Sequence, residues 1–255
     1  MTTTAMIDGM ARPAAGVAAI VRDAAKRTGV DFGYLIAQAR VESGLNPAAK
    51  ATTSSASGLF QFTAGTWLDT VKKHGAAHGM GWAADAIAQG AARAGTAARE
   101  TILALRDNAE AAALMAGEFA ADNGAALADK LGRAAGATDL YMAHFLGAGG
   151  AGKFLAALEA TPGKAAAGLF PEAAAANRGV FFGRDGAARS VAQVYHRFAA
   201  KLEAGQPLTP LATRVASRPL PQGERGTSLP LAGNALPVSA DRARLAYLLL
   251  AELGA

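Results

Sequence analysis

The pattern of apolar residues is the feature that most constrains the fold of this chain. Just over half of its 255 residues are apolar, and its Ala-rich stretches carry Leu, Ile and Val at intervals of three and four residues. Alanine is the strongest helix former, and this spacing places the larger side chains on one face of a helix. No stretch alternates β-branched and polar residues as a strand would. The sequence therefore predicts an all-α protein with enough apolar residues for a sizeable core.

Turn and capping residues divide the chain into predicted helices. The first covers residues 13–28, and Asp31 then caps a second that runs from Phe32 to Ser43. A third begins after Thr63 and stops at His74-Gly75, whereas residues 75–95 give no clear prediction. Later helices are expected from caps at Thr96, Asp107, Thr138 and Ser190, and Gly149-Gly150 is expected to interrupt the helix that follows Thr138.

A change in composition near Gly205 predicts the domain organisation. Six of the ten prolines lie between Pro207 and Pro237, together with several arginines, which is typical of an extended linker. Ser239 then caps a short Leu-rich amphipathic helix. We expect a helical domain over 1–204, a basic Pro-rich linker over 205–237 and a C-terminal helix over 238–255. That helix either packs on a core or docks a protein partner.

Composition and charge exclude several classes of function. The chain has no cysteine, and none of its four histidines lies in an HExxH pattern, so a thiolate metal site is excluded and a zinc hydrolase is disfavoured. The formal charge of +5 suits an acidic polymer, but the basic and aromatic residues are not interleaved as in a nucleic-acid reader. No run of 18 apolar residues predicts a membrane span, and the N-terminus lacks the pattern of a signal peptide. We expect no metal and no cofactor.

Two motifs carry the most specific information. Glu42-Ser43-Gly44-Leu45-Asn46-Pro47 is followed, after a Ser- and Ala-rich loop, by Ser57-Gly58-Leu59-Phe60-Gln61. This pair resembles the two leading motifs of the soluble lytic transglycosylase family, Glu-Ser-x-x-Asn-Pro and Gly-Leu-Met-Gln, with Phe60 at the Met position. A third segment, residues 143–147, is similar to the family's Ala-Tyr-Asn-Ala-Gly motif, with His144 at the Tyr position. The resemblance covers about residues 17–200.

The resemblance implies a lysozyme-like helical fold and cleavage of the bond between N-acetylmuramic acid and N-acetylglucosamine. It also implies that Glu42 acts first as a general acid and then as a general base, which gives a 1,6-anhydro product. An acid in this role needs a raised pKa, usually from apolar surroundings, and the nearby Leu59, Phe60 and Phe62 could supply them. Most glycosidases use two carboxylates, but no second acid lies between Glu42 and Asp69. A distant acid such as Asp69, Asp85 or Glu118 could still fold beside it.

Further residues are candidates for binding the glycan. By the resemblance these are Ser43, Ser57, Phe60, Gln61 and His144; Tyr141, one turn before His144, is an alternative source of a hydroxyl group. Each also has a plain structural interpretation, as a turn residue, a core residue or a loop amide bonded to backbone.

Three functions stay open at this point. The first is a lytic transglycosylase acting on peptidoglycan strands, the second is a hydrolytic muramidase, and the third is a non-catalytic wall-binding or assembly protein. The first two would act in the periplasm or cell envelope, by an export route that the sequence does not give. The C-terminal helix could dock an envelope-spanning machine or a phage particle.

Overall fold

A computed structural model of the chain describes residues 14–52 and 54–205. Within this part the regular elements are helices, and the only β-type pairing consists of isolated bridges such as Lys50 with Ser57 and Ser57 with Phe62. The α-helices are α1 (Ala14–Thr28), α2 (Phe32–Ser43), α3 (Ala64–His74), α4 (Gly81–Ala88), α5 (Ala97–Ala104), α6 (Ala109–Leu131), α7 (Ala137–Ala160), α8 (Ala166–Leu169), α9 (Pro171–Ala176), α10 (Arg178–Phe181) and α11 (Val191–Gly205). Two 3₁₀ turns, η1 (Gly75–His78) and η2 (Leu105–Asp107), follow α3 and α5. The predicted all-α class is confirmed.

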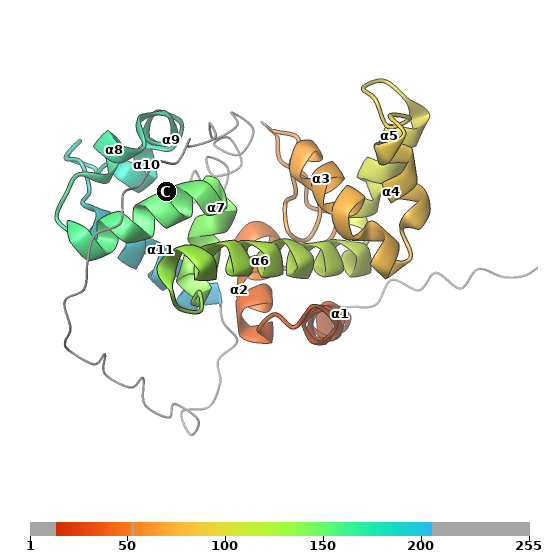
Figure 1. Cartoon of the computed structure of the whole chain (residues 1–255), viewed down its shortest axis with the longest axis horizontal. Coiled ribbons are helices and arrows are strands. Elements are labelled where there is room, and N and C mark those ends of the chain that lie inside the picture. The colour runs from red at the N-terminus through yellow and green to blue at the C-terminus, as the bar shows by residue number, and fades with distance from the viewer. Residues whose placement is uncertain (1–13, 53, 206–255) are drawn as a thin grey trace, which may run out of the picture.

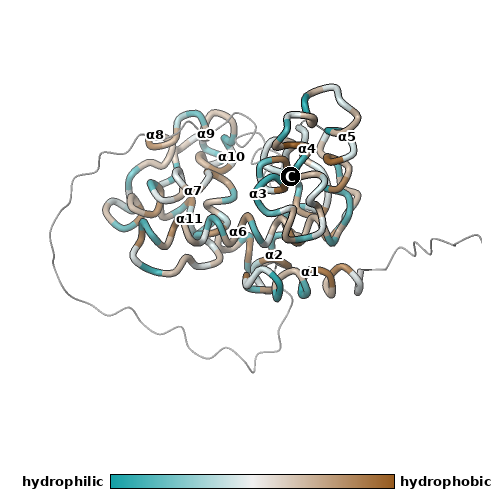
Figure 2. The backbone as a smooth tube through the Cα atoms, turned by 45° about the vertical axis from the view of Figure 1, so that its right-hand side comes forward, coloured by the Kyte–Doolittle hydropathy of each residue, from teal (hydrophilic) through white to brown (hydrophobic). Residues whose placement is uncertain are grey.

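Helix α6 is the central element of the arrangement. It runs through the middle of the molecule, with α3, α4 and α5 on one side and α7 to α11 on the other (Figure 1). Helices α1 and α2 lie along the remaining side, and Figure 2 shows the same arrangement after a rotation, with apolar segments in both groups. The most extensive helix contacts join α1 to α6, α6 to α7, and α11 to both α2 and α7. Helices α2 and α7 therefore share α6 and α11 as neighbours.

One continuous core holds these helices together. Its largest fully buried side chains come from α2, α3, α5, α6, α7, α10 and the loop before α3, and include Trp67, Tyr34, Tyr141, Phe60 and Phe154. Trp67 also donates a hydrogen bond from Nε1 to the carbonyl oxygen of Ile102, at 2.8 Å, which joins α3 to α5. A buried indole needs such a partner.

Helix α1 ends before Gly29 as predicted, while its predicted start at residue 13 lies outside the described residues. Helix α2 has the predicted bounds and is capped by Asp31, whose side chain accepts a hydrogen bond from the Tyr34 backbone. At the start of α11, Ser190 and Gln193 exchange side-chain-to-backbone hydrogen bonds, which is the reciprocal capping box predicted for that pair.

Two predicted caps and one predicted break are wrong. Asn108, and not Asp107, caps α6, because its Oδ1 accepts hydrogen bonds from the backbone N–H groups of Glu110 and Ala111. Gly136 is the N-cap of α7 in place of Thr138. The interruption of α7 falls at Gly147, whose φ of 71° is left-handed, and Gly149 and Gly150 are helical.

The segment 75–95, which gave no clear prediction, contains η1 and α4. The predicted linker beyond Gly205 and the predicted C-terminal helix lie outside the described residues. Among the described helices, none is both long enough and apolar enough to cross a membrane.

Candidate functional site

A stripe of polar side chains runs along the buried face of α2. Tyr34, Gln38 and Glu42 follow one another at intervals of four residues, so their side chains lie one above the other on the same helix face. All three residues are buried, at 2%, 3% and 9% exposure. Gly44, in the left-handed conformation, ends the helix two residues after Glu42 and donates its N–H to the carbonyls of Ala39 and Arg40. Glu42 therefore occupies the last turn, as the sequence predicts.

Helix α7 brings two further polar side chains to this stripe. His144 Nε2 lies 3.2 Å from Glu42 Oε1, and His144 Nδ1 lies 3.3 Å from Gln38 Nε2. Tyr141, one turn earlier, stacks on the His144 ring at a centroid distance of 5.8 Å. The first and third motifs of the sequence, about 100 residues apart, thus meet across the contact between α2 and α7.

The Glu42 carboxylate is enclosed by protein. Its side chain has no exposed surface, and neither oxygen has a partner with full hydrogen-bond geometry, although His144 is within ion-pair distance. Burial raises the pKa of Tyr34 and of Tyr141 well above the usual range, and the charge of Glu42 adds to the effect. Both phenols therefore stay protonated beside the carboxylate at physiological pH.

Aromatic rings connect the site to the loop that carries the second motif. Phe119 of α6 lies edge-on to His144 and to Phe62, in each case at a centroid distance of 6.3 Å. Phe62 in turn packs edge-on against Trp67, at 5.3 Å. Leu59, Phe60 and Phe62, from which the sequence predicts apolar surroundings for Glu42, are buried in the core, and Phe119 of α6 supplies the ring next to His144.

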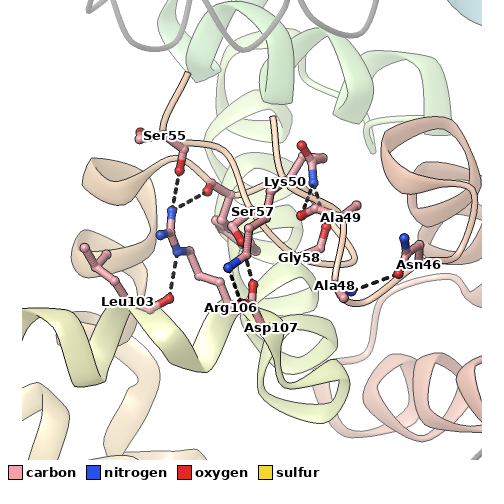
Figure 3. A network of polar contacts seen from close by, with 12 residues as sticks. Asn46, Ala48, Ala49, Lys50, Ser55, Ser57, Gly58, Leu103, Arg106 and Asp107 are labelled. Atoms are coloured by element: carbon pink, nitrogen blue, oxygen red, sulfur yellow. Dashed lines mark hydrogen bonds and ion pairs between the residues drawn. The ribbon is translucent and has the colours of Figure 1, made fainter. Parts of the chain in front are cut away.

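Hydrogen bonds from η2 hold the described parts of the loop, residues 48–52 and 54–62, in place (Figure 3). The Arg106 guanidinium donates to the carbonyl oxygens of Ser55 and Phe62, and its Nε donates to that of Leu103. Ser57 donates its hydroxyl to Asp107, which also forms an ion pair with Lys50 at 3.6 Å. The Ser57 hydroxyl, a candidate for glycan binding, is thus engaged within the protein in this structure.

Two residues of the second motif have unusual backbone conformations. Gly58 has a φ of 83°, and a Cβ at this position would overlap the backbone carbonyl of Arg106. Only glycine fits there. Gln61, with a φ of 47°, donates its side-chain amide to the carbonyls of Ala49 and Gly58, at 3.0 and 2.9 Å. The amide therefore fastens the two sides of the loop together.

The remaining predicted residues serve to connect the loop with α2. Ser43 donates its hydroxyl to the carbonyls of Ala39 and Leu59, at 3.1 and 2.8 Å, so it joins the turn after Glu42 to the second motif. Phe60 is 1% exposed and belongs to the core. Its side chain lies beneath the surface, where it supports the loop.

The three alternative acids lie in other surroundings. Asp69 and Asp85 are exposed. Glu118 is paired through Oε2 with His74, at 3.2 Å, and through Oε1 with His78, at 2.6 Å. None of the contacts of the described residues joins these acids to Glu42.

Tyr34 and Gln38 were not among the residues predicted for the site. A signal was present in the sequence, because polar residues at intervals of four on an otherwise apolar helix mark one face. Within residues 14–52 and 54–205 no group of three or more His, Asp or Glu side chains is placed to hold a metal ion.

The comparison with known families adds to this geometry. Residues 19–89 match the family model described as Transglycosylase SLT domain. The match includes Glu42 and the whole second motif, and ends before Tyr141 and His144. SLT domains act on peptidoglycan, and their fold is the helical, lysozyme-like one that the motifs implied. Residues 19–89 of this chain are therefore similar to the transglycosylase SLT domain, a match consistent with the lysozyme-like superfamily.

Proposed function

We propose that the protein is a peptidoglycan lytic transglycosylase that cleaves the β-1,4 bond between N-acetylmuramic acid and N-acetylglucosamine, with Glu42 as its acid and base. The observation that carries the proposal is the setting of Glu42. It is a buried carboxylate within 3.2 Å of His144, in a chain segment that matches the SLT family. A lone surface glutamate would have no such surroundings.

The proposed reaction needs one carboxyl group. Protonated Glu42 gives its proton to the glycosidic oxygen as the bond from that oxygen to C1 of the muramoyl sugar breaks. The Glu42 carboxylate then takes the proton of the C6 hydroxyl, whose oxygen attacks C1 and closes the 1,6-anhydro ring. Glu42 regains its proton and no water is consumed.

The surroundings of the other acids support this one-carboxylate scheme. Glycosidases with two carboxylates place them about 5 to 10 Å apart across the scissile bond. Asp69 and Asp85 are exposed, and the histidine pairs of Glu118 hold it at the contact between α6 and the α3–η1 segment. A substrate that supplies its own nucleophile has no need of a second acid.

The enclosure of Glu42 has a consequence for binding. Because its side chain has no exposed surface, neighbouring side chains must shift before a sugar oxygen reaches it. Such tightening and rearrangement on binding is common for catalytic groups, whose hydrogen bonds are often incomplete without substrate. The substrate of such an enzyme lies in the cell envelope, and we propose that the protein acts there.

The test is digestion of purified peptidoglycan followed by mass spectrometry of the soluble products. The wild type should release muropeptides with 1,6-anhydro ends, and Glu42→Gln should lower the rate by at least about 10²-fold, the usual contribution of a general acid. Glu110→Gln, at an exposed position of α6, is a matched control that should keep the wild-type rate.

The products distinguish the alternatives. Reducing ends would indicate a hydrolytic muramidase and would refute the transglycosylase scheme. Binding to peptidoglycan without cleavage by the folded wild type would indicate a non-catalytic wall-binding protein.

A further inference from the structure

Gln38 is a buried amide that the proposed mechanism does not yet use. It is 3% exposed, it lies one turn before Glu42 on α2, and its Nε2 is 3.3 Å from Nδ1 of His144. A buried amide is costly unless it is hydrogen-bonded. The contact with His144 is the one side-chain hydrogen bond that Gln38 makes among the described residues, and its Oε1 has no partner there.

The chemistry of the three groups decides which atoms carry protons once Glu42 is the carboxylate, the state that it reaches after giving up its proton. An ionised Glu42 can only accept, so His144 Nε2, which lies 3.2 Å from Glu42 Oε1 without full hydrogen-bond geometry, is the nitrogen that must carry the proton for the two to bond. In a neutral imidazole one ring nitrogen donates and the other accepts. Nδ1 must then be the acceptor, and the Nε2 amide group of Gln38 is the donor that faces it.

We propose that Gln38 is a positioning residue that holds His144 as the neutral tautomer with its proton on Nε2, directed at Glu42. The inference rests on the proposed function, because it assigns a role toward the proposed acid. When Glu42 gives its proton to the glycosidic oxygen, the His144 N–H stabilises the carboxylate that forms. Without Gln38, Nδ1 of His144 loses the donor that faces it, and the preference for the Nε2–H tautomer rests on Glu42 alone.

The groups around His144 are suited to this role. Tyr141 stacks on one face of the ring and Phe119 lies at its edge. Tyr34 and Tyr141, which face Glu42, remain neutral phenols because burial and the carboxylate raise the pKa of both. The proton on His144 is therefore set by Gln38 on one side and by Glu42 on the other.

The direct test is the tautomer of His144 in the full-length protein. Nitrogen-15 NMR of the histidine rings distinguishes the two neutral tautomers and the imidazolium, and a His144→Gln sample assigns the signal among the four histidines. We expect the Nε2–H form in the wild type at neutral pH. The Nδ1–H form in the wild type would overturn the proposal, whatever activity the protein has.

Two substitutions of Gln38 separate positioning from a structural role. Gln38→Leu removes the donor at similar volume, and we expect mixed tautomers and a fall in kcat of about 2- to 10-fold with KM within about twofold, the size of one hydrogen bond between neutral groups. Gln38→Glu places an acceptor beside Nδ1, so His144 should become doubly protonated at higher pH than in the wild type, and the pH profile of kcat should move with it.

Gln89→Leu, at an exposed position after α4, should change neither the His144 signal nor kcat. An unchanged His144 tautomer in Gln38→Leu, with or without a change in activity, would refute the positioning role. The proposed transglycosylase activity is tested separately, by the digestion products and by Glu42→Gln. A failure of that function can therefore be told apart from a failure of this inference, which the His144 tautomer tests.

Discussion

Replacing Asp139 with alanine tests how the polar face of α7 is held in place. Asp139 is 1% exposed and joins three segments: its Oδ2 accepts from Arg133, at 2.7 Å, and from the Gly136 backbone, at 3.0 Å, and its Oδ1 accepts from the Tyr195 hydroxyl, at 2.9 Å. It thus ties the turn between α6 and α7 to α11, one half-turn before Tyr141. Burial and the Asp139 charge raise the pKa of Tyr195 to about 12, which keeps that hydroxyl a donor.

The expected cost follows from these three partners. Hydrogen bonds to a charged group contribute about 1.5 to 3 kcal/mol each, and two of the donors are partly buried. The Arg133 side chain is 48% exposed and regains water, so its ion pair adds at most about 1 kcal/mol. The variant also no longer buries a carboxylate, and the desolvation cost that it avoids offsets part of the stability lost with the three contacts. We expect Asp139→Ala to lower the free energy of unfolding by about 3 kcal/mol, within a total of roughly 5 to 15 kcal/mol.

Thermal and urea unfolding measure this loss. For a domain of this size 1 kcal/mol corresponds to about 2–4 °C, so Tm should fall by roughly 6–12 °C. Asp139→Asn keeps the shape without the charge, so its Tm should lie between those of the wild type and Asp139→Ala. Asp129→Ala, at an exposed position of α6, should keep a free energy of unfolding within about 0.5 kcal/mol of the wild-type value. If Asp139→Ala lowers Tm by less than about 2 °C, the three contacts do not stabilise the fold as argued.

Two further predictions concern other parts of the molecule. Gly58→Ala should destabilise the protein by at least about 2 kcal/mol, because the left-handed backbone and the overlap with the Arg106 carbonyl act together. Urea unfolding measures this loss, and an unfolding midpoint equal to that of the wild type would contradict the close approach of the two backbones. Burial by itself would raise the pKa of Asp122, but hydrogen bonds from Lys73 and His74 outweigh it and lower that pKa. Its folded pKa is below the unfolded value, so the stabilisation is complete above about pH 4 and is lost as the pH falls further. Tm measured from pH 6 to pH 2 should therefore fall less for Asp122→Asn than for the wild type, and parallel curves would count against the assignment.

The fold class, the bounds of the first helices and the position of the proposed acid follow from the sequence alone. Local rules were sufficient for these, because apolar spacing, Asp31 and the Ser190–Gln193 pair act over one or two turns. The wrong prediction of a cap at Asp107 has one local and one long-range cause. Two adjacent residues, Asp107 and Asn108, both suit an N-cap, and Ser57 engages Asp107 from a loop 50 residues away.

The surroundings of Glu42 depend on long-range packing. Sequence spacing places Tyr34, Gln38 and Glu42 on one face of α2, but it does not reveal that α7 brings His144 between Gln38 and Glu42. Nor does it show that Glu118 is held by two histidines. These contacts join residues 40 to 106 positions apart, and they depend on how α2, α6 and α7 pack around a shared core, which no local pattern encodes.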